Sequence, residues 1–231
     1  MRIGLLADAH GNIYAFEKIW EALLAQNCDA HVFLGDVCGY YYYQNEIIEI
    51  LRRDTRMVAI AGNHDHLFLQ ALDNPALLKA RDAYRELGKS FDLFHDRITP
   101  ENLDFLKNLP SQHIWAEESI LAVHASPLDA KEYVYPDSPL EKFVRLPYRY
   151  VVLGHTHYAM DREAHGIRFI NPGSCGQPRD SHEPSFAVLD TKTQVVDMMR
   201  VDYERWRILE DIRGFDDPNP YLIEVLDRKR R

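Results

Sequence analysis

The sequence of 231 residues has little cysteine, no long apolar run and no excess of positive charge. Its three cysteines, Cys28, Cys38 and Cys175, form an odd and sparse set, which argues against a disulfide framework and fits a reducing compartment. No apolar run approaches the ~20 residues that a membrane span needs, and Asp8 interrupts the first apolar run too early for a signal peptide. We therefore expect a cytoplasmic protein that has no membrane partner.

The formal net charge of −9 argues against a long nucleic acid as partner, because such binding depends on many Lys and Arg contacts to phosphate. A small phosphorylated substrate is not excluded, since a bound metal ion can be the largest charge in a site. We therefore expect a small phosphorylated partner, with nucleotides among the candidates. The sequence leaves the oligomeric state open.

Apolar strands alternate with amphipathic helices at the start of the chain. Strands are expected at 2–7, 31–34 and 56–61, and helices at 13–26 and 44–53, which is the α/β pattern. Further strands are expected at 111–115, 119–123, 148–153, 158–163, 167–171, 185–190 and 194–201, before two closing helices at 203–213 and 221–231. We predict an α/β fold of two packed sheets with flanking helices, in a single domain that spans 1–231.

A mainly helical segment, at about 66–110, interrupts this alternation. Pro75 would open one helix that runs to Leu87, and Thr99 would cap another. The segment could form a cap over a functional site, or it could simply cover one edge of a sheet. Both interpretations are compatible with the sequence.

Polar side chains follow several of the predicted strands, at the carboxyl ends where open α/β sheets bind ligands. They are Asp8, His10, Asp36, Asn63, His64, His124, His155 and His157. Asp8 and His10 would share one side of an extended backbone, because residues two apart point to the same face. The two carboxylates, one amide and five imidazoles are the ligand types that hold a pair of divalent metals. The sequence therefore predicts a dinuclear metal hydrolase.

The order of these clusters resembles a known family. Asp8-x-His10, Gly35-Asp36-x-x-Gly39, Gly62-Asn63-His64-Asp65, His124 and Gly154-His155-x-His157 are similar to the motifs of the calcineurin-like metallophosphoesterase superfamily. The stretches 35–40, 123–127 and 171–179 resemble its small prokaryotic phosphodiesterase-like branch. The resemblance implies a four-layer α/β/β/α sandwich of two mixed sheets, to which 66–110 would add a small helical cap.

The resemblance also implies a role for each residue of the site. Asp8, His10 and His157 would hold one metal, Asn63, His124 and His155 would hold the second, and Asp36 would bridge the two. A hydroxide shared by the metals would attack phosphorus. His64 would protonate the leaving oxygen, and Asp65 would orient its imidazole. Mixed oxygen and nitrogen ligation without thiolate favours two divalent ions of Mn or Fe, and Ni, Co or Zn would also fit.

The substrate is less closely defined by the sequence. Gly39-Tyr40 stands where protein phosphatases of the family carry a phosphate-gripping Arg, which argues against a phosphoprotein substrate. Tyr41 and Tyr42, within a run of four tyrosines, could stack on a base, or the run could pack its own loop. Arg179 could clamp a phosphate oxygen or lie on the solvated surface.

The favoured function is a metal-dependent phosphoesterase that hydrolyses phosphodiesters or nucleotides, with phosphodiesters preferred over phosphomonoesters. Two alternatives stay open at this stage. One is a hydrolase of dinucleoside polyphosphates, whose scissile bond is an anhydride. The other is a binding module that senses a metal or a nucleotide with little turnover.

Overall fold

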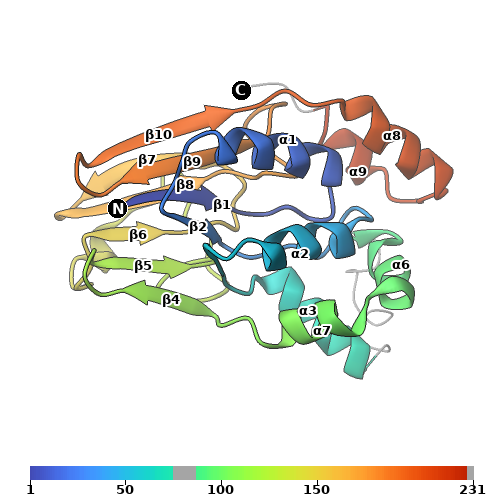
Figure 1. Ribbon diagram of the computed structural model, residues 1–231, viewed down its shortest axis with the longest axis horizontal. Coiled ribbons are helices and arrows are strands. Elements are labelled where there is room, and N and C mark those ends of the chain that lie inside the picture. The colour runs from blue at the N-terminus through green and yellow to red at the C-terminus, as the bar shows by residue number, and fades with distance from the viewer. Residues whose placement is uncertain (75–86, 228–231) are drawn as a thin grey trace.

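Two mixed five-stranded sheets form the centre of the molecule in the computed structural model, which describes residues 1–74 and 87–227 (Figure 1). The first has the order β10-β9-β1-β2-β3 and consists of β1 (Arg2–Leu6), β2 (Ala30–Phe33), β3 (Met57–Ala59), β9 (Ser185–Asp190) and β10 (Val195–Arg200). The second has the order β4-β5-β6-β8-β7 and consists of β4 (Gln112–Trp115), β5 (Ile120–Val123), β6 (Tyr150–Val152), β7 (Ala159–Ala164) and β8 (Ile167–Pro172). The predicted α/β fold of two mixed sheets is confirmed.

Each sheet has a parallel centre with antiparallel strands added to it. β1, β2 and β3 are parallel to one another, and so are β5, β6 and β8, whereas β9, β10, β4 and β7 pair antiparallel. The carboxyl ends of β1 and β2 therefore lie at one edge of the first sheet, and those of β5 and β6 at one edge of the second. The loops that follow these strands carry the predicted ligands.

The two sheets pack face to face through alternate side chains of their strands. Leu5 and Val32 of the first sheet lie in one buried cluster with Ala122, Val152 and Ile170 of the second. Neighbouring residues such as Leu6 point to the opposite face and pack under helices. Both faces of the central strands are therefore buried, which explains their nearly continuous apolar sequences.

Helices cover the outer face of the first sheet. They include α1 (Ile13–Leu24), α2 (Gln44–Arg53), α8 (Arg205–Gly214) and α9 (Tyr221–Glu224). The side chain of Asn12 caps α1 by accepting a hydrogen bond from the Ala15 amide at 3.3 Å. Phe16, Ile19 and Leu23 then recur on its buried face.

The outer face of the second sheet is covered differently. Val134, Leu140 and Phe143 from the segment 125–149 pack on Val151 and Phe169 of the sheet. Within that segment the structure has one 3₁₀ turn, η1 (Glu141–Phe143). An irregular segment thus forms the layer for which the four-layer sandwich predicted helices.

The segment 66–110 contributes α3 (Asn63–Asp73), α6 (Ser90–Arg97) and α7 (Pro100–Lys107) among the described residues. As predicted, Thr99 caps α7, with its hydroxyl accepting from the Asn102 amide at 3.2 Å. The predicted helix from Pro75 to Leu87 lies almost entirely outside the described residues. α6 and α7 pack on α2 and so extend the helical layer; a cap over the site stays a prediction.

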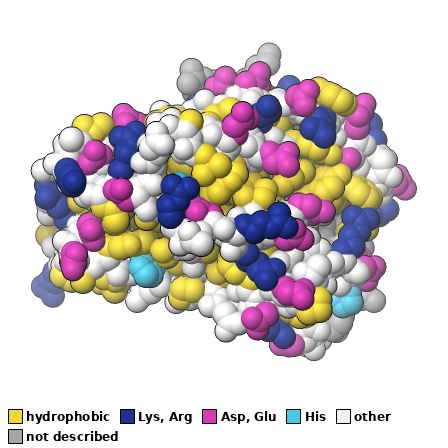
Figure 2. Space-filling model, viewed as in Figure 1, with side chains coloured by type: hydrophobic (Ala, Val, Ile, Leu, Met, Phe, Trp, Pro, Cys, Tyr) yellow, Lys and Arg dark blue, Asp and Glu magenta, His cyan; other side chains and the backbone are white. Residues whose placement is uncertain are grey.

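The surface seen from this side is mixed in charge. Figure 2 shows Lys and Arg side chains interspersed with Asp and Glu among the described side chains on this face. Within residues 1–74 and 87–227, every helix is too short or too polar to cross a bilayer.

Candidate metal centre

The predicted ligands come together where the loops after four strands meet. Asp8 and His10 follow β1, Asp36 follows β2, and His124 follows β5. The remaining three are His155 and His157, which follow β6, and Asn63, which begins α3. Buried Asp and His side chains form two groups, one of Asp8, His10 and His157 and one of Asp36, His124 and His155, each with its ligand atoms within 4.8 Å of one another. We call these the first group and the second group.

Most of these residues have a left-handed backbone. The φ angles are 57° at Asp8, 47° at His10, 61° at Asp36, 69° at His155 and 63° at His157. The expectation that Asp8 and His10 share a face of an extended backbone is therefore wrong, and tight turns aim both side chains inward. A non-glycine residue in this region costs roughly 1–3 kcal/mol where it is strained, and such strain is concentrated at functional sites.

The first group has two nitrogen lone pairs that face each other. His10 Nδ1 lies 2.8 Å from the Cys38 carbonyl oxygen, and His157 Nδ1 lies 2.6 Å from that of Gln177. Since a carbonyl only accepts, each Nδ1 carries its hydrogen and, in a neutral ring, Nε2 is left as an acceptor. The two Nε2 atoms are 3.1 Å apart, and His157 Nε2 is 3.7 Å from Asp8 Oδ1. A cation among these acceptors would remove their repulsion.

The second group repeats this pattern around His124. Its Nδ1 lies 2.7 Å from the Leu34 carbonyl oxygen, so that Nε2 points to Asn63 Oδ1 at 2.9 Å and to Asp36 Oδ2 at 3.3 Å. His155 completes the group, and its Nε2 is buried with no hydrogen-bond partner among the described residues. Such an orphaned nitrogen fits a site that is completed by a metal.

Asp36 lies between the two groups. Its Oδ2 is 3.8 Å from His10 Nε2 in the first group and 3.3 Å from His124 Nε2 in the second. Its Oδ1 accepts the His64 backbone N–H at 2.8 Å, which fixes the carboxylate plane. Gly62 permits this approach, because a Cβ at that position would collide with Asp36 Oδ1. A carboxylate in this position could contact an ion in either group.

Burial and mutual interaction shift the pKa values of the Asp and His side chains of the site. Burial raises the pKa of Asp8 to about 8, and the Asp36 carboxylate acts in the same direction. Burial also lowers the pKa of His155 to about 3 and that of His10 well below its usual value. Although burial alone would raise it, the nearby His124 and His64 imidazoles hold the pKa of Asp36 well below its usual value. Although burial alone would lower it, the Asp36 carboxylate raises the pKa of His124 to about 10. Imidazole nitrogens and buried carboxyl oxygens form a donor set that fits divalent cations.

His64 lies beside the first group without belonging to it. Its ring centroid is 4.9 Å from that of His10 and 5.1 Å from that of Tyr40. Its Nδ1 is buried and makes no hydrogen bond within the described parts of the chain. Burial lowers the pKa of His64, and the charges of Asp36 and Asp65 partly offset this shift by raising it. The ring is thus placed at the edge of the metal groups, where it could exchange a proton with a bound molecule.

Asp65, which the resemblance implied would orient the His64 imidazole, instead accepts hydrogen bonds from backbone N–H groups. Its Oδ2 accepts the backbone N–H groups of Gly62 and Asp36, and its Oδ1 accepts that of Cys38, each at 2.9 Å. The carboxylate therefore ties the loop after β2 to the first turn of α3. The expectation that it orients the His64 imidazole is corrected: it acts on that ring only through its charge, and its main contacts position Asp36.

The expectation that Tyr41 and Tyr42 could stack on a base is also corrected. Tyr41 is fully buried and donates to the Leu222 carbonyl oxygen at 3.2 Å, and Tyr42 is buried and donates to Asp217 Oδ2 at 3.1 Å. Both side chains anchor the C-terminal segment and cannot stack on a substrate. Tyr40 is the member of the run that contacts the site, with its ring 4.7 Å from that of His10.

Arg179 lies at the site, as the phosphate-clamp interpretation predicted. Its backbone N–H donates to the His157 carbonyl oxygen at 3.3 Å, and its Nη2 donates to the Tyr40 hydroxyl at 3.3 Å. Its Nε is buried and has no hydrogen-bond partner among the described residues. A half-buried guanidinium beside the first group is suited to binding an anionic oxygen.

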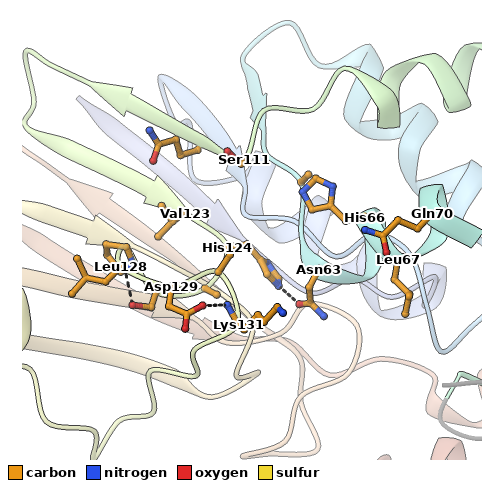
Figure 3. A pocket seen from close by; sticks show the side chains of 16 residues that line it. Asn63, His66, Leu67, Gln70, Ser111, Val123, His124, Leu128, Asp129 and Lys131 are labelled. Atoms are coloured by element: carbon orange, nitrogen blue, oxygen red, sulfur yellow. Dashed lines mark hydrogen bonds between the residues drawn. The ribbon is translucent and has the colours of Figure 1, made fainter. Parts of the chain in front are cut away.

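Two features of the site were not predicted from the sequence. The ring of Tyr133 stacks on that of His155 with centroids 3.9 Å apart and an interplanar angle of 26°. A cavity of about 540 Å³ adjoins Asn63 and His124 and is lined by residues that include Gln70 and Lys131 (Figure 3). The only sequence signal for the cavity is the spacing of Asn63, His66 and Gln70, which places them on one face of a helix.

Comparisons with known proteins agree with this geometry. An uncharacterised protein of Methanocaldococcus jannaschii is 27% identical over an alignment of 235 positions, gaps included, which covers 91% of this chain and 91% of that protein. The structure of a metallophosphoesterase from Sphaerobacter thermophilus is 25% identical, covers 98% of both chains and superposes with a TM-score of 0.81. A structure described as a novel archaeal phosphodiesterase is 18% identical, covers 87% of this chain and 100% of that chain, and has a TM-score of 0.55, a likeness that shows the fold alone. The model of the calcineurin-like phosphoesterase superfamily domain matches residues 1–194. This chain therefore belongs to the calcineurin-like phosphoesterase superfamily.

Proposed function

We propose that the protein is a dinuclear metal-dependent phosphoesterase that hydrolyses phosphodiesters, including nucleotide esters, in preference to phosphomonoesters. The observation that carries the proposal is the position of Asp36, whose carboxylate lies between two buried groups of acceptor atoms. Asp8, His10 and His157 would hold one ion, Asn63, His124 and His155 would hold the other, and Asp36 would contact both. Mn or Fe is favoured for this mixed oxygen and nitrogen donor set, and Ni, Co or Zn would also fit.

When bound, the metal pair would supply Lewis-acid polarisation of the phosphoryl oxygens and an activated water. The chain supplies the rest. Arg179, held against Tyr40, would contact a phosphoryl oxygen and fix the orientation of the ester. His64, which faces His10 and Tyr40, would give a proton to the leaving oxygen.

The preference for diesters rests on the surroundings of the metal groups. Tyr40 stands where a phosphate-gripping Arg is expected in protein phosphatases of the family, which argues against a phosphoprotein substrate. The solved structure described as an archaeal phosphodiesterase shares the fold. We propose a small phosphorylated molecule as the substrate and the cytoplasm as the place of action.

The test uses protein that has been stripped of metal and reconstituted with Mn²⁺. Hydrolysis of a bis-aryl phosphodiester is measured beside that of the matching aryl monoester, with and without a chelator. We expect cleavage that the chelator abolishes and that is faster for the diester. Metal analysis should give two ions per chain. Cleavage that survives the chelator would contradict the metal mechanism, and absence of cleavage of both esters would turn attention to anhydride substrates.

A further inference from the structure

The cavity beside the second group is a groove between a helix and a loop. One wall is α3, which presents Asn63, His66 and Gln70 from one face (Figure 3). The opposite wall is the segment 125–131 after β5, and Ser111 and Gln112, where β4 begins, also line the groove. A volume of about 540 Å³ falls within the roughly 300–1,000 Å³ of small-molecule sites.

The inner end of the groove is part of the metal centre. Asn63 and His124 both line it, and Asn63 Oδ1 lies 2.9 Å from His124 Nε2. His64, the next residue of α3, faces the other way, toward His10 and Tyr40. Two consecutive residues in the first turn of α3 thus divide the site into two sides. A phosphorus atom between them would have its leaving group on the His64 side and its second substituent at the mouth of the groove.

The lining of the groove selects the chemistry of that substituent. It offers the amides of Gln70 and Gln112, the ammonium of Lys131 and the carboxylate of Asp129 as hydrogen-bonding groups. Lys131 and Asp129 balance in charge, and the Asp129 carboxylate accepts the Lys131 backbone N–H at 2.9 Å. Among its lining residues, all within the described part of the chain, the aromatic rings are the imidazoles of His66 and of His124, and His124 belongs to the second group. Apolar side chains, those of Leu67, Val123 and Leu128, line the groove as well. A mixed lining without a surplus of positive charge suits a neutral, hydroxyl-bearing group better than a second phosphate or an aryl group without hydroxyls.

We propose that this groove binds the alcohol that remains on phosphorus, and that it selects phosphodiesters in which that alcohol carries several hydroxyl groups, as a nucleoside sugar or a glycerol does. This inference rests on the phosphodiesterase function proposed above. In the reaction a water oxygen bonds to phosphorus, the bond from phosphorus to the leaving oxygen breaks, and one water proton ends on the leaving alcohol. The product that remains in the groove is the phosphomonoester of the polyol.

The experiment varies only the retained alcohol. Diesters of p-nitrophenol with the 5′-hydroxyl of thymidine, with glycerol, with phenol and with methanol share one leaving group, and Mn²⁺-loaded protein is used throughout. We expect kcat/KM for the thymidine or glycerol ester to exceed that for the methyl ester by at least about 10-fold, and the phenyl ester to gain less. The better of the first two esters identifies the source of the polyol.

Two variants test the groove itself. Gln70 and Lys131 are exposed, so Gln70→Leu and Lys131→Met should fold normally. Each should lower kcat/KM for the preferred polyol ester by about 3- to 10-fold, mainly through KM, with the methyl ester within about twofold of wild type. Lys18→Met is the matched control, because Lys18 is an exposed residue of α1 that does not line the groove. It should change kcat/KM for neither the polyol ester nor the methyl ester.

Equal losses on all four esters, or a wild-type enzyme that prefers the methyl ester, would overturn the proposed role of the groove while leaving the phosphodiesterase function standing. Absence of cleavage of every ester would instead contradict the proposed function. In that case calorimetry with thymidine 5′-monophosphate and glycerol 3-phosphate tests, without any turnover, whether the groove binds the polyol. Binding that Gln70→Leu weakens would support the groove, and binding that it leaves unchanged would overturn it.

Discussion

The first and second metal groups differ in what surrounds them. Asp8 and His10 of the first group are 0% exposed, and His157 is 2% exposed. In the second group His124 and His155 are each 6% exposed, and Asn63, half-buried beside them, lines an open groove. The first group lies deeper in the core, whereas the second borders the groove. The second group is therefore the one with a groove beside it, whereas Arg179 and His64 lie beside the first.

The two groups also differ in the contacts that hold them in place. The loop that carries Asp8 is tied down by a later segment, because Cys175 donates to Ala7 and the Ser174 hydroxyl donates to the Asp8 carbonyl oxygen at 2.6 Å. In the second group, by contrast, the His155 ring packs against Tyr133, which is 45% exposed and comes from the irregular segment over the second sheet. The second group is therefore the one whose geometry depends on the surface of the molecule.

Replacing Asp36 with Asn should have the largest effect, since its Oδ2 lies 3.8 Å from His10 Nε2 of the first group and 3.3 Å from His124 Nε2 of the second. We expect activity to fall by roughly 10²–10³-fold or more and the affinity for both ions to fall together. Metal analysis and ester hydrolysis check the result, with Asp96→Asn, a highly exposed position, as the control. Loss of one ion alone would show that the two groups are independent and would remove the bridging role.

Replacing His64 with Ala tests whether the leaving group lies on the side of the first group. We expect a loss of ~10²–10⁴-fold for alkyl esters, whose leaving oxygen needs a proton, and a small loss for p-nitrophenyl esters. Rates for a series of leaving groups provide the measurement. His95→Ala, which removes an exposed imidazole, serves as control. An equal loss across the series would argue against proton donation by His64.

Replacing Tyr133 with Ala should have the smallest effect of the three and should be confined to the second group. Loss of a stacked ring should weaken binding of one ion by about 2- to 10-fold and leave the other ion unchanged. Tyr133→Phe keeps the ring and should bind both ions like wild type. Titrations of each variant with metal, monitored by calorimetry, distinguish the two variants. Weakened binding in Tyr133→Phe would mean that the hydroxyl matters more than the stacking.

The sequence predicted which Asp and His side chains lie together, because their chemistry and their places after apolar strands are local features. The backbone geometry of these residues was not predictable in the same way. The residues at Asp8 and His10 adopt left-handed φ angles that tertiary contacts impose, and a pattern of residue types does not encode them. Asp65 was misassigned for a similar reason, since its three donors come from two separate loops.

The positions of the aromatic residues could not be predicted from the local sequence. A run of tyrosines beside Asp36 suggested a stacking surface, but Tyr41 is buried by contacts to Leu222, far along the chain. Tyr133, which does face the site, lies in a segment without periodicity, so nothing in the sequence marked it. Burial of a side chain is decided by which distant elements pack on it, and the local pattern does not contain that information.

The most direct test of the account is a crystal structure of the Mn²⁺-loaded protein with anomalous scattering data. We predict two anomalous peaks on either side of Asp36, roughly 3.5–4 Å apart. One should lie among Asp8, His10 and His157, and the other among Asn63, His124 and His155. A single peak, or peaks that Asp36 does not contact, would contradict the dinuclear centre on which the proposed function depends.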